Sequence, residues 1–185
     1  LNIGTINGQI EFRHFRNDFS ARYFDALYEL DRARIDLSSG RAHSKDALLT
    51  NSEPRSGIFG RLGVNLGTYM HASAAYQYLS SNDNPQQQLL VNAHLSSALL
   101  SSIPRLTHAR AYFKKNNIGM RLSDDGTQSD GFFEATEDTF YGYEIGLEMN
   151  GGVSIFCDVR YLFNREADDQ IRRKKIMLIE TVFNF

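Results

Sequence analysis

The sequence of 185 residues predicts an all-β fold in which residues 1–185 form one antiparallel up-and-down β-barrel domain. Three observations predict it. Apolar residues recur at every second position in successive segments, as they do on one face of a strand. The polar links between these segments alternate between short and long, and aromatic residues gather near the ends that border the long links. Together they favour a barrel of about 8–10 strands, with turns at one rim and loops at the other.

The N-terminal part of the chain contains three predicted strands. They are Ile6 to Phe15, Arg22 to about Asp36, and Gly57 to Leu66. The middle segment is ambiguous, because its apolar residues also group at the spacing of an amphipathic helix. Its alternation of Phe24 with Asp25 favours a strand, and we predict one there.

The remaining strands alternate more clearly. They are Tyr69 to Tyr78, Gln88 to Leu99, Arg105 to Lys115, Thr139 to Met149, Val153 to Phe163 and Lys175 to Phe185. Residues Asn150, Gly151 and Gly152 separate two of them, and a glycine-containing link of this length is typical of a β-hairpin. The sequence therefore predicts nine strands.

Link length gives independent support for a barrel in a membrane. Short links are predicted near Asn17, near Thr68, at Ser101 to Pro104 and at Asn150 to Gly152, and longer ones at Leu37 to Ser56, Ser80 to Gln87, Asn116 to Asp138 and Asn164 to Lys174. Transmembrane barrels have short periplasmic turns, longer extracellular loops and an even number of strands. Because nine is odd, we expect that the chain is the C-terminal part of a longer protein with a larger barrel, or that Arg22 to Asp36 is misassigned.

The chain ends in the strand KIMLIETVFNF, whose Met177, Ile179, Phe183 and Phe185 share one side. This ending resembles the terminal strand of bacterial outer-membrane β-barrels, whose chains typically finish on Phe. The resemblance implies a Gram-negative outer membrane as the location and outer-membrane lipid as a partner. It also implies that Phe185 belongs to the signal read by the barrel-assembly machinery.

The other side of the zigzag segments is polar, and in a barrel it would face the lumen. The candidate lumen-lining residues are Arg61, His71, Asn92, His94, His108, Arg110, Glu144, Glu148, Asp158, Arg160 and Glu180. Acids and bases confined in a narrow barrel must pair, because an unpaired buried charge is costly. We therefore predict ion pairs across the strands rather than carboxylates paired for acid–base catalysis.

Enzyme chemistry has no support in the motifs. His71 with Ser73 and His94 with Ser96 share an H-x-S spacing that lipid A deacylases of the outer membrane also use. The nearest acidic residue that follows His94 and Ser96 is Asp124, and we interpret both histidines as lumen residues and predict no enzyme. No nucleotide-binding or zinc-protease motif occurs, and the one cysteine, Cys157, lies among apolar residues. We expect no cofactor and no metal.

Composition gives no support for nucleic-acid binding or for a membrane-spanning helix. The 20 basic and 22 acidic residues are interspersed, which gives no footprint for nucleic acid. No apolar run approaches the roughly 18 residues of a spanning helix. We expect a porin-like transport channel or export pore, or the membrane-embedded part of a larger envelope assembly. The alternatives are a closed structural or adhesion barrel that binds envelope proteins through loops 37–56 and 116–138, and a soluble lipocalin-like barrel with its apolar face inward.

Overall fold

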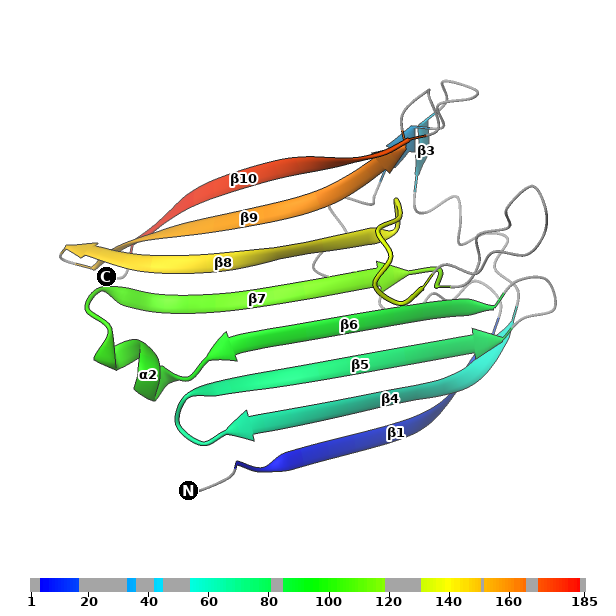
Figure 1. Ribbon diagram of the computed structural model, residues 1–185, viewed down its shortest axis with the longest axis horizontal. Helices are drawn as coiled ribbons and strands as arrows, with labels where there is room; N and C mark the ends of the chain where they lie inside the picture. Colours follow the sequence, from blue (N-terminus) through cyan, green and yellow to red (C-terminus); the bar gives the residue numbers. More distant parts are fainter. Residues whose placement is uncertain are drawn as a thin grey trace.

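The computed structural model describes residues 4–16, 33–35, 42–44, 54–80, 85–118, 131–150, 152–165 and 170–183. Eight antiparallel strands form one sheet in the order β1-β4-β5-β6-β7-β8-β9-β10 (Figure 1). Their bounds are β1 (Ile6–Phe15), β4 (Arg55–Leu66), β5 (Met70–Ser80), β6 (Gln86–Leu95), β7 (Leu106–Asn116), β8 (Thr139–Asn150), β9 (Val153–Arg165) and β10 (Ile171–Phe183). The all-β, up-and-down prediction is confirmed.

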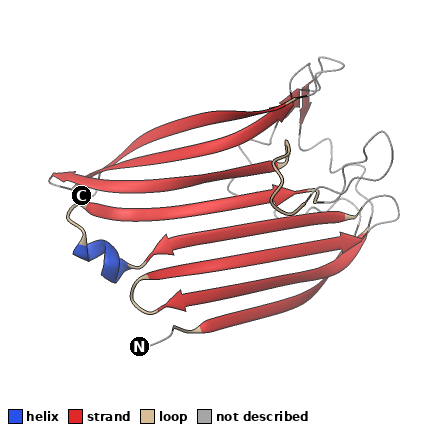
Figure 2. Cartoon of the chain, viewed as in Figure 1, coloured by secondary structure: helices blue, strands red, loops and turns tan. Residues whose placement is uncertain are grey.

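The sheet is open in the part of the chain that the structure describes. Each strand pairs with its neighbours in the sheet order, and no ladder joins β1 to β10. Figure 2 shows one layer made almost entirely of strands. Closure of this layer into a barrel stays a prediction.

The predicted strand at Arg22 to Asp36 is not a member of this sheet within the described residues. Of that segment, residues 33–35 form β2 (Ala33–Ile35), which pairs with β3 (Ala42–Ser44) in a separate two-stranded sheet. The rest of the segment and the link near Asn17 lie outside the described residues. The eight strands place the start of β1 and the end of β10 at the same rim, because consecutive strands reverse direction. The sheet that the structure describes therefore has an even number of strands.

Tight turns occupy the rim where β1 begins. Residues 67–69 join β4 to β5, and the glycine link predicted at Asn150 to Gly152 joins β8 to β9. Gly67 and Gly152 have φ angles of 57° and 85°, which side chains disfavour and glycine adopts freely. The predicted hairpin is confirmed.

The third link at this rim differs from the prediction. Strand β6 ends at Leu95 rather than Leu99, and α2 (Ser97–Ser102) follows. The Ser96 hydroxyl accepts a hydrogen bond from Leu99 N at 3.2 Å, which caps the helix and ends the strand. Residues 96–105 therefore form a longer link than residues 81–85 at the opposite rim, so strict alternation of length is wrong here. In the described part of the chain, no helix has the length and apolar character needed to cross a membrane.

The ladders assign every strand residue to one of two faces, because residues paired across strands point the same way. One row across all eight strands is Ile6, Val64, Ala72, Ala93, Ala111, Tyr143, Val159 and Met177, and it defines the apolar face. The adjacent row is Asn7, Gly63, Ser73, Asn92, Tyr112, Gly142, Arg160 and Ile176, and it defines the polar face. The predicted separation of apolar and polar sides is thus seen along these two rows, whereas the buried Phe59, Leu79 and Phe140 also belong to the polar face.

The apolar face is uncovered over much of its area. Ile10 is 84% exposed, Phe12 76% and Ile179 63%. Among the large hydrophobic side chains of the eight strands that are exposed, Leu178 and Val182 belong to the polar face and the others to the apolar face. Soluble monomers rarely expose a continuous apolar surface of this kind.

Candidate functional site

The predicted lumen residues all lie on the polar face where the structure describes them. His71, His94, Arg110, Glu144 and Asp158 form one continuous row across β5 to β9. Arg61, Asn92, His108, Glu148, Arg160 and Glu180 occupy neighbouring rows of the same face. Phe185 lies outside the described residues.

The carboxylate of Glu144 on β8 contacts two basic side chains of β7. Glu144 Oε2 lies 3.2 Å from His108 Nε2 and 3.6 Å from Arg110 Nη1. Arg110 also donates through Nη2 to the side-chain oxygen of Asn92 on β6, at 3.1 Å. The Glu144 side chain is 26% exposed, so this group is partly screened by solvent. These contacts connect three strands across the polar face.

A second group surrounds the carboxylate of Asp158 on β9. Arg160 Nε donates to Asp158 Oδ2 at 2.5 Å, and Arg160 Nη2 forms an ion pair with the same oxygen. The Tyr112 hydroxyl donates to Asp158 Oδ1 at 2.9 Å. Glu144 and Asp158 are register partners, so the two groups are adjacent and each carboxylate has its own basic partner. The arrangement therefore consists of two adjacent groups of ion pairs, each centred on one carboxylate.

Two glycines on β8 make the contacts between β7 and β9 possible. A Cβ atom at Gly142 would lie 2.4 Å from Val159 O and 2.6 Å from the Tyr112 hydroxyl. At Gly146 it would lie 2.8 Å from the Phe156 ring, which packs against His108 with ring centroids 5.9 Å apart. The small residue on the central strand thus lets side chains from both neighbours meet above it.

A third group lies at the edge formed by β1. Arg13 donates through Nη1 to the Gln77 side-chain oxygen at 2.6 Å and through Nε to Glu11 at 2.8 Å. Its guanidinium lies 3.7 Å from the centre of the Phe59 ring, which is 3% exposed. The contact between Arg13 and Gln77 reaches across β4. Polar side chains therefore bridge non-adjacent strands at both ends of the sheet.

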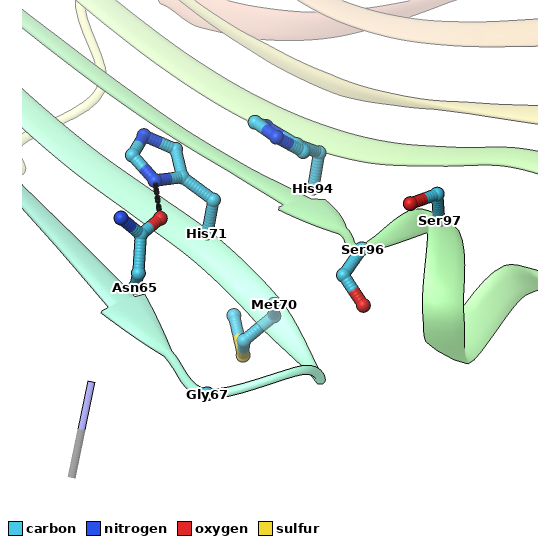
Figure 3. A pocket seen from close by; sticks show the side chains of 7 residues that line it. All are labelled: Asn65, Gly67, Met70, His71, His94, Ser96 and Ser97. Atoms are coloured by element: carbon cyan, nitrogen blue, oxygen red, sulfur yellow. Dashed lines mark hydrogen bonds between the residues drawn. The ribbon is translucent and has the colours of Figure 1, made fainter. Parts of the chain in front are cut away.

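Two histidines line a shallow depression at the turn rim, shown in Figure 3. The rings of His71 and His94 are 5.0 Å apart, and His71 Nδ1 lies 2.5 Å from the Asn65 side-chain oxygen. The Ser96 hydroxyl donates to Thr68 O and caps α2. Of the two H-x-S pairs, therefore, His71 with Ser73 shares a strand face, whereas Ser96 lies beyond the end of β6.

No metal centre is formed by the residues that the structure describes, since no group of three or more His, Cys, Asp or Glu side chains is placed to hold an ion. Tyr112, Gly142 and Gly146 were missed as site residues in the sequence. Tyr112 could have been found, because it has the same parity as His108 and Arg110 on β7. The roles of the glycines depend on which side chains flank them on neighbouring strands. Comparison with protein-family models, curated proteins and solved structures finds no match.

Replacing Asp158 with Ala should lower the free energy of unfolding by about 1–3 kcal/mol, because Tyr112 and Arg160 lose the carboxylate to which both donate. Glu148→Ala is the matched control. Glu148 is an exposed carboxylate on the same face, and its removal should change stability by less than about 0.5 kcal/mol. Guanidinium unfolding of both variants measures the difference. Equal effects would contradict a stabilising role for the Asp158 group.

Proposed function

We propose that this chain forms the wall of a transmembrane β-barrel in a bacterial outer membrane, where its polar face lines a hydrophilic channel or export pore. The observation that carries the proposal is the contrast between the two faces. The apolar face exposes Ile10, Phe12 and Ile179, whereas arginines and carboxylates on the polar face bind one another. A hydrocarbon solvent on one side and a polar interior on the other would account for both faces.

The open edges support a barrel wall more than an isolated sheet. In lipid, every backbone N–H and C=O group needs a partner, so the outer edges of β1 and β10 must pair when the sheet enters a membrane. They can pair with each other or with further strands of a larger envelope assembly. Further strands would widen the lumen, whereas eight strands alone would leave an interior nearly filled by side chains.

The aromatic residues agree with a membrane orientation. Tyr76, Tyr78, Phe113, Tyr141, Tyr143, Tyr161 and Phe163 belong to the apolar face on the side of the longer links. Rings of Tyr141 and Tyr161 stack with centroids 5.0 Å apart, and the Arg173 guanidinium lies 5.1 Å from the Tyr161 ring. Aromatic and basic side chains together are typical of the boundary between hydrocarbon and headgroups. This rim would face outward, and loops 37–56 and 116–138 would meet envelope partners there.

A closed structural barrel is the second candidate, and the neutralised charges around Glu144 and Asp158 favour it. Two measurements separate the possibilities. Extraction from outer membranes with heat-modifiable mobility on a detergent gel identifies a folded membrane barrel. Single-channel conductance in a planar bilayer then identifies a pore. A folded barrel without conductance supports the closed form, and a protein soluble without detergent contradicts both and favours the lipocalin-like alternative.

The resemblance of the terminal strand to outer-membrane proteins gives a further prediction. Phe185→Ser should reduce the amount of folded protein in the outer membrane, because the assembly machinery is expected to read that strand. Phe12→Ser removes an exposed aromatic residue from β1 instead and should leave the yield close to normal. Quantifying heat-modifiable protein in membrane fractions compares them. Unchanged yield of Phe185→Ser would count against an assembly role for that residue.

A further inference from the structure

Residues 131–138, which we call the covering segment, precede β8 and lie at the rim of the longer links (Figure 1). The Phe132 ring is 5.7 Å from the ring of Tyr76 on β5. The Phe133 ring is 5.8 Å from the ring of Phe113 on β7. Both partners point from the apolar face, so the covering segment meets the sheet on its apolar side.

A lysine ammonium fixes the covering segment on this face. Lys115 Nζ donates to Gly131 O at 2.5 Å and to Glu134 O at 2.8 Å, and the lysine is 0% exposed. An ammonium withdrawn from water requires such acceptors, because its unpaired burial is costly. Thr139 Oγ1 donates to Glu134 O at 3.3 Å as well. The segment is therefore held by polar contacts beneath it.

The phenylalanines of the covering segment nevertheless remain uncovered. Phe133 is 77% exposed and Phe132 48%. They adjoin the aromatic residues of the apolar face, where Tyr78 is 40% exposed. The covering segment thus adds two ring pairs, Phe132 with Tyr76 and Phe133 with Phe113, beside the contacts of Lys115. Such a combination suits the layer between headgroups and acyl chains, where rings contact hydrocarbon and backbone groups contact water.

We propose that the covering segment is a lipid-contact site at the outer interface of the membrane, in which Phe132 and Phe133 insert among the acyl chains next to the headgroups. The proposal rests on the proposed function, because it requires the apolar face to meet lipid. It adds that a connecting segment, and not the strands alone, contributes to the membrane surface. The two phenylalanine rings contact the part of the acyl chains that lies closest to the headgroups.

The chain contains no tryptophan, so one introduced tryptophan reports on one position. We would place Phe133→Trp in vesicles of phosphatidylcholine brominated either near the headgroup or near the acyl-chain end. Its fluorescence should be quenched more strongly by the shallow bromines. Ile179→Trp, two residues beyond the midpoint of β10 on the apolar face, is the matched control and should be quenched more strongly by the deep bromines.

The outcomes separate the two proposals. Quenching of Ile179→Trp without quenching of Phe133→Trp would overturn the lipid-contact site and leave the membrane barrel standing. Stronger deep than shallow quenching of Phe133→Trp would also overturn the interfacial site. If neither tryptophan is quenched, the proposed function itself fails. Adding Lys115→Ala to Phe133→Trp should reduce shallow quenching, and unchanged quenching would overturn the role of the lysine contacts.

Discussion

Ile179→Arg should lower the free energy of unfolding in phospholipid bilayers by about 2–4 kcal/mol, the cost of an arginine on the lipid side near the membrane midplane. Ile179 lies two residues beyond the midpoint of β10, pairs with Cys157 and is 63% exposed. On a surface that faces water, such an exposed residue would tolerate arginine with a change within about 0.5 kcal/mol. The size of the loss of stability therefore distinguishes an apolar face that meets lipid from one that meets water. Reversible guanidinium unfolding in vesicles measures it.

Leu178→Arg provides the matched control, one position away on the opposite face of the same strand. Leu178 is 40% exposed and pairs in register with Asp158. An arginine there would enter the polar face beside a carboxylate, so we expect little loss of stability. A loss as large as that of Ile179→Arg, or tolerance of arginine at both positions, would contradict the assignment of the two faces.

Gly142→Ala should destabilise the sheet by about 1–3 kcal/mol, because the added methyl group has no space. Its Cβ would lie 2.4 Å from the backbone oxygen of Val159 and 2.6 Å from the Tyr112 hydroxyl. The tyrosine ring could turn away and lose its bond to Asp158, but the backbone of β9 would still have to shift. Guanidinium unfolding in vesicles provides the measurement.

Gly60→Ala is the control for Gly142→Ala, since it makes the same chemical change on β4. An added Cβ at Gly60 meets no atom within 4 Å. The variant should be neutral or more stable by up to about 1 kcal/mol, because alanine restricts the unfolded chain. Equal stability of the two variants would contradict the inference that the contacts around Gly142 leave no space for a side chain.

Much of the sheet was predictable because each strand shows its own alternation of apolar and polar residues. Strand β1 has the predicted bounds, Ile6–Phe15, and the glycine hairpin after β8 also agrees. Of the segment Arg22 to Asp36, the described residues 33–35 form β2 outside the main sheet, because membership of a sheet depends on partners far along the chain. The predicted end of β6 at Leu99 was wrong, because the hydroxyl of Ser96 caps a helix and so ends the strand earlier.

The polar face was predictable as a set of residues, whereas its contacts were not. Parity alone places Glu144 and Asp158 on one face, but register decides that they are opposite each other. The bond from Tyr112 to Asp158 spans β8 and requires the glycine at position 142, which no single strand reveals. The burial of Lys115 by the covering segment was not predicted, because that segment is a link whose sequence shows no alternating pattern.

The native cysteine offers the most direct measurement of which solvent meets the apolar face. Cys157 belongs to that face and is partly exposed, so a nitroxide attached to it in vesicles reports on its surroundings. The label should collide more often with dissolved oxygen, which concentrates in hydrocarbon, than with a water-soluble nickel chelate. A label at Ser73→Cys in a Cys157→Ser background, on the polar face, should show the reverse preference if the lumen is hydrated. Greater access of the nickel chelate to the Cys157 label would contradict a lipid-facing apolar side.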